Sequence, residues 1–375
     1  MSASQASPQF FIGLMSGTSL DGVDGVLVDF KDEQLRVYAH KTLPFAAALK
    51  QELLALNTPS DNELHRAALA ANGLVRLYAQ TVQALLKDTC THAHEVRAIG
   101  AHGQTVRHQP GAFDGTGYTI QLNNPALLAE LCGIDVVADF RSRDVAAGGQ
   151  GAPLVPMFHQ GIFGESKKSV GVLNIGGIAN LSVLHANGEA LGFDCGPGNA
   201  LLDHWCQTHT GYAFDNNGDW GASGTVIESL LQNMLTEPFL HQIPPKSTGR
   251  DLFHPTWLAH QLSGYSNAKA EDVQATLTEF TAQACANDVL RYAYEITELI
   301  VCGGGALNGL LMQRLKASLP HIQVCCSADR GIPPLQVEAA AFAWLARQSV
   351  LGLPGNLPTV TGAQGARILG GIFKA

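Results

Sequence analysis

The sequence predicts an α/β protein of two units, each of which begins with two strands joined by a glycine-rich turn. At 375 residues, the chain has the usual length of about two domains. In the first half, two apolar runs, Phe10–Met15 and residues 26–30, flank such a turn. In the second half, residues 169–175 and 178–184 repeat the arrangement around a Gly-Gly pair. Helical and strand patterns alternate after both pairs, which is typical of α/β domains.

The first unit continues as strands and helices in alternation. Apolar residues recur every three to four positions from residue 63 to residue 87, which indicates an amphipathic helix. Asn124 before a proline combines a helix cap with a residue that favours the first helical position. The remaining predicted elements are strands at 34–43, 96–100, 118–122 and 134–138, and a further helical pattern around 53–56. We expect this unit to cover residues 1–145, with the C-terminal tail from about 357 to 375 as a candidate to pack back on it.

A loop of small residues at 146–156 marks the expected crossing into the second unit, residues 146–356. After its opening pair of strands, this unit contains four segments with helical spacing, a short apolar strand, and two further helices. The helices are predicted at 200–209, 226–235, 255–262, 273–294, 307–319 and 336–348, and the strand at 299–302.

Composition and charge argue against several classes of protein. The formal net charge is −9 and no Lys/Arg run exceeds two residues, so we expect no nucleic acid partner. No apolar run approaches the roughly 18 residues of a membrane span, so we expect no membrane partner. The first basic residue is Lys31, which argues against a secretory signal. The eight cysteines form no Cys-x-x-Cys pair and have the pattern of reduced thiols in a cytoplasmic protein.

The first glycine-rich turn offers the groups that hold a phosphate chain. Backbone N–H groups and hydroxyls bind phosphate oxygens, and carboxylates or water suit the Mg²⁺ that accompanies them. We therefore predict that this turn binds a phosphate chain with its Mg²⁺ ion, which Asp21 would serve directly or through water. The predicted phosphate-binding residues are Gly17, Thr18, Ser19, Leu20, Asp21, Gly22, Val23 and Asp24. The alternative is a β-hairpin whose Asp-Gly pairs only set the turn.

Two more glycine turns are candidates for the same ligand. Gly176 and Gly177 form the turn that opens the second unit. Gly303, Gly304 and Gly305 end an apolar strand and precede a helix, where small residues let a ligand lie against the backbone and a helix N-terminus faces anions. The third turn matches neither a Walker loop nor a G-x-G-x-x-G fingerprint. A tight packing turn between strand and helix is the alternative.

The motifs together resemble one family, the anhydro-N-acetylmuramic acid kinases of the actin-like ATPase superfamily. The similar stretches, at 13–24, 100–105, 138–141, 174–180 and 192–199, are spread over essentially the whole chain. The resemblance implies two actin-like (ribonuclease H-like) domains, each a mixed β-sheet flanked by helices, with the nucleotide in the cleft between them. It also implies that the turn at 303–305 supports the adenosine. One departure is Cys195, where the family pattern more often has threonine.

The resemblance further implies a reaction that belongs to peptidoglycan recycling. ATP, water and 1,6-anhydro-N-acetylmuramate give ADP and N-acetylmuramate 6-phosphate, and related enzymes suggest a homodimer. Asp194 lies between glycine-containing stretches and is the candidate base that takes a proton from the attacking water, as in an inverting glycosidase. The alternative is that Asp194 only forms a turn or caps the helix after Asn199.

Polar residues of the first unit are candidates for binding the sugar. His102, Gln104 and Arg141 supply the variety of hydrogen bonds that acetamido and lactyl groups demand. Arg141 suits the lactyl carboxylate. The competing interpretation of Arg141 is a surface salt bridge with Asp139 or Asp144.

Glu338 is a lone carboxylate in an apolar helix, and it faces either the substrate or the solvent. Two other functions stay open from sequence. One is a non-catalytic actin-like module that changes shape with ATP and binds a protein partner. The other is an ordinary sugar or acid kinase, in which Asp194 would deprotonate a substrate hydroxyl and water would take no part.

Overall fold

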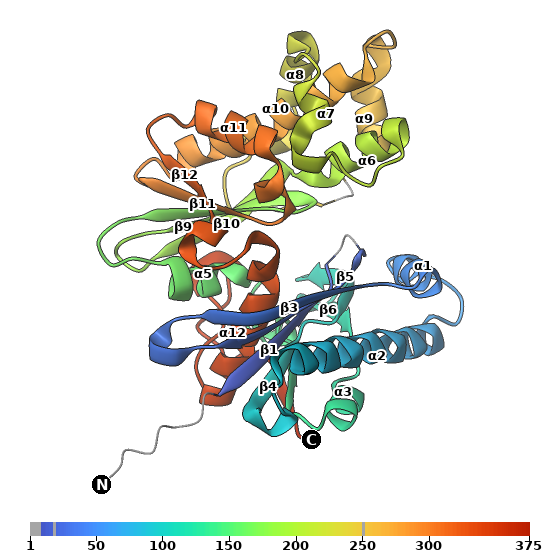
Figure 1. Ribbon diagram of the computed structural model, residues 1–375, viewed down its shortest axis with the longest axis vertical. Coiled ribbons are helices and arrows are strands. Elements are labelled where there is room, and N and C mark those ends of the chain that lie inside the picture. The colour runs from blue at the N-terminus through green and yellow to red at the C-terminus, as the bar shows by residue number, and fades with distance from the viewer. Residues whose placement is uncertain (1–8, 18–19, 250–251) are drawn as a thin grey trace. The chain divides into compact units, whose positions relative to one another are not determined.

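The computed structural model describes residues 9–17, 20–249 and 252–375, and the described chain forms two compact units (Figure 1). Unit 1 combines Met1–Phe158 with Gln336–Ala375, and unit 2 is His159–Leu335. The expected boundaries were residues 145 and 356. The chain therefore leaves the first unit later than expected and returns to it about twenty residues earlier.

Unit 1 is built on a mixed sheet of six strands in the order β13-β7-β4-β1-β2-β3. The first three strands of the chain form an antiparallel meander, and β4 and β7 run parallel to β1 and β4 respectively. The strands are β1 (Phe10–Met15), β2 (Gly22–Asp29), β3 (Arg36–Pro44), β4 (Val96–Ala101), β7 (Val136–Ala138) and β13 (Gly371–Phe373). A separate antiparallel pair consists of β5 (Gln104–Pro110) and β6 (Gly117–Leu122). The C-terminal strand β13 pairs with β7, at the edge of the sheet.

Helices cover both faces of this sheet. They are α1 (Ala47–Ala55), α2 (Glu63–Thr89), α3 (Pro125–Cys132), α4 (Ser142–Ala146), α12 (Val337–Leu351) and α13 (Pro358–Thr361), and α5 (Val155–Phe163) carries the chain into unit 2. Ile12 and Leu14 of β1 share a buried cluster with Tyr78 of α2. Because side chains alternate along a strand, Gly13 lies on the opposite face, which packs against α12.

Glycine is required where α12 lies on the sheet. A Cβ atom at Gly13 would stand 1.8 Å from the Ala339 carbonyl oxygen, and one at Gly100 would stand 2.0 Å from the Phe342 carbonyl oxygen. The backbone of α12 therefore rests directly on β1 and β4. Gly13, at the head of the first motif, serves packing in this structure.

Unit 2 repeats the strand arrangement of unit 1. Its five-stranded sheet has the order β10-β9-β8-β11-β12, again with three antiparallel strands followed by two parallel ones. The strands are β8 (Val170–Ile175), β9 (Ile178–Leu184), β10 (Ala190–Pro197), β11 (Glu298–Cys302) and β12 (Gln323–Cys326). The helices are α6 (Asn199–Thr210), α7 (Asp219–Ala222), α8 (Glu228–Leu235), α9 (Pro255–Gln261), α10 (Ala270–Tyr292) and α11 (Gly309–Ser318).

The predicted fold class, two α/β units each with a mixed sheet flanked by helices, is confirmed. The long predicted helices and the opening hairpins are present, with ends shifted by a few residues. Sequence patterns missed β5, β10 and β12, which are short or rich in glycine and polar residues. In the part of the chain that the structure describes, no helix has the length and apolar character needed to cross a membrane.

Candidate active site

The turn after β1 is attached to the loop that follows β4. Thr18 and Ser19 lie outside the described residues. Ser16 Oγ donates to the carbonyl oxygen of Gly103 at 3.0 Å, and Gln104 Nε2 donates to the carbonyl oxygen of Gly17 at 3.2 Å. The structure therefore brings two predicted site residues, Gly17 and Gln104, into contact.

The remaining residues of this turn have different surroundings. Leu20 and Val23 are buried in the core, so they can offer a ligand only backbone groups, and Gly22 is paired with Pro44 at the start of β2. The Asp21 side chain is 77% exposed, with Lys50 Nζ 3.6 Å from its Oδ1 atom. Asp24 lies along β2 and accepts a hydrogen bond from Thr42 Oγ1 at 2.5 Å. Among the described residues, the two carboxylates thus have different ion-pair and hydrogen-bond partners.

In unit 1, the half-buried Arg141 binds the buried ring of His102. Arg141 donates from Nε and Nη2 to His102 Nε2, at 3.2 and 3.0 Å, and from Nη1 to the Gly151 carbonyl oxygen at 2.8 Å. Burial, with the charge of Arg141 as a second cause, lowers the pKa of His102 to about 3. His102 is therefore neutral near pH 7, and because its Nε2 accepts, its proton is on Nδ1.

Three buried polar atoms around this pair have no hydrogen-bond partner among the described residues. They are His102 Nδ1, Gln104 Oε1 and Asn123 Oδ1. Asn123 follows β6 directly, and its Nδ2 donates to the Ala101 carbonyl oxygen at 3.2 Å, which places it beside the end of β4. Buried polar groups are rarely left unpaired in proteins, so such a cluster indicates a polar ligand. The sequence analysis missed Asn123, although a polar residue between a strand and a helix cap was a usable signal.

Glu338 and Arg141 lie close enough to influence each other. Burial lowers the pKa of Arg141 to about 10, while the negative charges of Glu338 and Asp144 act in the opposite direction. Glu338 is half-buried in the first turn of α12, so it does not lie on a fully solvent-exposed face. Arg141 is held by His102 and Gly151, and the predicted alternative of a surface salt bridge does not describe it.

In unit 2, the two predicted glycine turns lie side by side. Gly176 and Gly177 connect β8 to β9, and their carbonyl oxygens accept from the backbone N–H groups of Asn199 at 2.7 Å and Gly198 at 3.0 Å. Gly303 has a φ angle of 78°, and a Cβ atom there would stand 2.7 Å from the carbonyl oxygen of Ile175. The turn at 303–305 therefore packs against the end of β8 just before Gly176.

Asp194 lies in strand β10, where the sequence analysis had placed it on a turn. The register between β10 and β9 shifts between Asp194 and Gly196, which makes Cys195 a bulge. Bulges re-aim side chains and are frequent beside active sites. Asp194 Oδ2 accepts from Ser247 Oγ and from the Thr248 backbone N–H, both at 2.9 Å. The carboxylate therefore does not cap α6, which was the predicted alternative.

The surroundings of Asp194 act on the pKa of its carboxyl group in both directions. Burial raises the pKa of its carboxyl group, while the Thr248 N–H, the Ser247 hydroxyl and the charge of Lys246 oppose this, and the net effect is upward. Ser247 and Thr248 were missed from sequence. The run Ser-Thr-Gly after a basic residue was the available signal.

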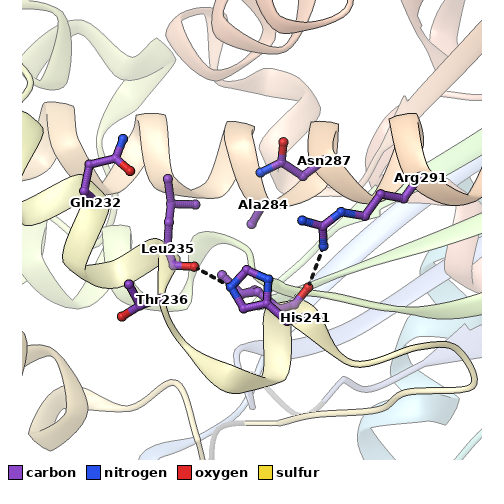
Figure 2. A pocket seen from close by; sticks show the side chains of 8 residues that line it. Gln232, Leu235, Thr236, His241, Ala284, Asn287 and Arg291 are labelled. Atoms are coloured by element: carbon purple, nitrogen blue, oxygen red, sulfur yellow. Dashed lines mark hydrogen bonds between the residues drawn. The ribbon is translucent and has the colours of Figure 1, made fainter.

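The predicted site residues form no metal cluster in the described chain, and they do not line the cavity between α8 and α10 of unit 2. Within the described ranges, no group of three or more His, Cys, Asp or Glu side chains is placed to hold a metal ion. A cavity of about 330 Å³ lies between α8 and α10, and Figure 2 shows its lining, with Arg291 and His241 among the labelled residues. None of the predicted site residues lines it.

The family model and the curated relatives match nearly the whole chain. The family model described as anhydro-N-acetylmuramic acid kinase matches residues 9–375. A protein of Variovorax paradoxus with that name is 63% identical over 98% of this chain and 99% of its own length. Its namesake from Cupriavidus metallidurans is 58% identical over 100% of both chains. A solved glucokinase of the ROK family from Streptomyces griseus has 14% identity and a TM-score of 0.42, over 90% of this chain and 99% of its own.

The family model covers far more than half of the chain, and the relatives exceed the identity at which proteins share a family. The chain therefore belongs to the anhydro-N-acetylmuramic acid kinase family.

Proposed function

We propose that this chain uses ATP and water to open the anhydro ring of 1,6-anhydro-N-acetylmuramate and to phosphorylate O6. The products are N-acetylmuramate 6-phosphate and ADP, and the role is recycling of peptidoglycan. Membership of the kinase family supports the substrate and the use of ATP. A cytoplasmic location and a homodimeric state are further parts of this proposal.

The observation that carries the proposal is the setting of Asp194. Its carboxylate is held by Ser247 and Thr248, and burial raises its pKa. A carboxylate with a raised pKa is a better proton acceptor while still ionised at neutral pH. In this role Asp194 takes a proton from the water that attacks C1, and O6, released from C1, takes the γ-phosphoryl group. The step balances: the C1–O6 bond, the bond between the γ-phosphorus and ADP, and one O–H bond of water break, while a C1–O bond to the water oxygen and an O6–P bond form. ADP is the leaving group, and the proton of water goes to the Asp194 carboxylate.

The buried polar atoms of unit 1 support recognition of the sugar. The His102 Nδ1–H group is a donor, and Gln104 Oε1 and Asn123 Oδ1 are acceptors, which matches the mixed needs of an acetamido group and hydroxyls. Arg141 supplies positive charge for the lactyl carboxylate. The negative charge of Glu338 helps to keep Arg141 protonated, since it raises the pKa of Arg141.

The glycine turns are assigned to the nucleotide. Backbone groups of residues 17–24 and of Gly176 and Gly177 contact the phosphates, and the turn at 303–305 contacts the adenosine. The exposed carboxylate of Asp21 fits an Mg²⁺ ion that keeps most of its water and binds the phosphates. When bound, Mg²⁺ neutralises charge on the transferred phosphoryl group.

Turnover in oxygen-18 water tests the proposal. The label is expected on the anomeric hydroxyl of the product and not in its phosphate, and early product should show inversion at C1, since water arrives opposite O6. Asp194→Asn keeps the shape of the side chain and should abolish ring opening and phosphorylation together. Label in phosphate, or ATP-independent ring hydrolysis, would contradict this scheme. An ordinary hydroxyl kinase would leave the anomeric oxygen unlabelled at early times.

A further inference from the structure

We propose that the buried ion pair of Lys246 and Asp288 positions Asp194, because it fixes the segment 246–248 that holds the Asp194 carboxylate. The proposal rests on the proposed function, in which Asp194 activates water. Lys246 and Asp288 are positioning residues and touch no reacting atom.

The segment 246–248 contacts Asp194 through three consecutive residues. The Asp194 backbone N–H donates to the Lys246 carbonyl oxygen at 3.0 Å. Ser247 Oγ and the Thr248 backbone N–H donate to Asp194 Oδ2, each at 2.9 Å. Any shift of this segment therefore moves both donors to the carboxylate at once.

Lys246 anchors an otherwise exposed segment. Its side chain is 0% exposed, while the residues on either side of it are exposed. Its Nζ atom lies 2.8 Å from Asp288 Oδ2, whose side chain is 2% exposed. The ammonium group also lies 5.7 Å from the ring centroid of Phe193 and 5.2 Å from that of Phe239. A buried ammonium group needs such partners, so the position of the segment is tied to Asp288.

The pair also contacts both chain neighbours of Asp194. The Phe193 ring faces the Lys246 ammonium group, and the Cys195 thiol is among the groups that lower the pKa of the Asp288 carboxyl group. Asp288 belongs to α10, a helix of 23 residues, and is therefore on a rigid element. One turn further along α10, Arg291 Nη1 donates to the Leu240 carbonyl oxygen at 3.3 Å (Figure 2).

The same carbonyl oxygen of Leu240 accepts a longer bond from Lys246 Nζ, at 3.4 Å. Two residues of α10 thus hold the chain on the way to Ser247. Asp194 remains paired with Asn180, and Cys195 is the residue that the bulge leaves unpaired. Because β10 is an edge strand, the backbone bond from Asp194 to Lys246 adds a contact beyond its single sheet partner.

Within the described ranges, the Lys246 ammonium group acts on Asp194, Asp288 of α10 pairs with Lys246, and Arg291 lies one turn further along α10. Lys246 lowers the pKa of Asp194. Arg291 acts on Asp288, whose pKa it lowers. Neutralising the pair therefore removes the nearby positive charge, and the pKa of Asp194 rises.

The test is the paired variant Lys246→Met with Asp288→Asn, which removes both charges without leaving either one buried alone. We expect kcat to fall by roughly 10²-fold, as for a base displaced by about 1 Å. The KM for ATP should stay within twofold of that of the parent chain. In a plot of kcat against pH, the acid limb, where kcat rises with pH, should move to higher pH. A folded paired variant with the parent kcat and acid limb would overturn the proposal.

A second variant keeps the test decisive if the paired variant fails to fold. Asp288→Glu retains both charges but lengthens the side chain by one methylene group. Here kcat should fall while the acid limb stays in place, and an unchanged kcat in the folded variant contradicts the positioning role.

Glu298→Gln is the matched control. Glu298 is a buried acid of the same unit that accepts from Lys168 Nζ at 2.8 Å, and its loss should lower the melting temperature without moving the acid limb. The single variant Asp194→Asn distinguishes a failure of the proposed function from a failure of the positioning role. If that variant keeps turnover, the proposed function fails. If it is inactive while the paired variant behaves like the parent, only the positioning role fails.

Discussion

Arg141 donates two hydrogen bonds to a single atom, Nε2 of His102, at 3.2 and 3.0 Å. An arginine cannot accept, so this contact fixes the tautomer of the histidine, with its proton on Nδ1. Through the same contact, the position of Arg141, which we propose to bind the lactyl carboxylate, also sets the orientation of the imidazole ring.

Replacing Arg141 should therefore weaken sugar binding specifically. Lys cannot donate in parallel from a planar fork, so Arg141→Lys loses the hold on His102 as well as the paired contact with a carboxylate. We expect the KM for the sugar to rise by about 10-fold or more, the loss of one charge-assisted hydrogen bond. The KM for ATP should change little. Arg143→Lys is the control, since Arg143 is exposed two residues away. An unchanged sugar KM in Arg141→Lys would remove Arg141 from the binding residues.

The carboxylate of Asp21 should set the requirement for Mg²⁺. Asp21→Asn removes the charge while asparagine tolerates the same turn conformations. We expect turnover to fall at least about tenfold, with half-maximal activity at a higher Mg²⁺ concentration, because phosphate charge is less well neutralised. Asp32→Asn, at an exposed position after β2, serves as the control. Parent-like Mg²⁺ titrations of both variants would count against the assignment of Asp21.

His159 should make unit 2 sensitive to acid. Its side chain is 0% exposed, its Nδ1 atom lies 3.0 Å from Ser182 Oγ, and burial lowers its pKa from 6.5 to about 3. Below pH 6.5 the unfolded state binds a proton that the folded state does not bind until about pH 3. The stability that neutral His159 contributes is thus complete above pH 6.5 and is lost as the pH falls.

At pH 5 this loss amounts to about 2 kcal/mol, at 1.36 kcal/mol per pH unit. His159→Gln keeps a hydrogen-bonding group beside Ser182 but does not titrate. We compare the free energy of unfolding, measured in urea, at pH 7.5 and at pH 5. Between these two pH values it should fall by about 2 kcal/mol less in His159→Gln than in the parent. The exposed residue His65 gives the control variant His65→Gln, for which no difference is expected. Equal losses in the parent and in His159→Gln would contradict the assignment.

Two glycine substitutions in unit 1 should have opposite effects. Gly13→Ala places a methyl group 1.8 Å from a carbonyl oxygen of α12, so the helix must move away from the sheet. We expect a loss of about 3 kcal/mol or more. In Gly73→Ala, on α2, the new methyl group meets only the flexible end of Leu49 at 3.3 Å, and the gain in helix propensity is up to about 1 kcal/mol. Thermal unfolding of both variants measures this, and a melting temperature for Gly13→Ala at or above that of the parent would refute the packing role.

Local patterns determined the fold class and much of the element order. The helical period from residue 63 predicted α2, and the cap Asn124 before proline predicted the start of α3, where Asn124 Oδ1 accepts from the Leu127 N–H. Such features depend on residues within one or two turns of each other, and are therefore visible in the sequence. The glycine turns at 176–177 and 303–305 were also predicted from local sequence. The packing of one turn beside the other was not predicted.

The tertiary structure determined the relations between residues that are far apart in the chain. Asp194 was predicted as a base from its motif, but its bulged strand and its donors Ser247 and Thr248, more than fifty residues away, come from the fold. Asn123 joined the candidate sugar-binding residues because β5 and β6 pair beside the end of β4. The ion pair of Lys246 and Asp288 is formed by one residue of an exposed segment and one of a long helix. Sequence motifs specify which chemical groups are present, whereas burial and pairing across the chain set their pKa values and orientations, because both depend on neighbours that only packing brings together.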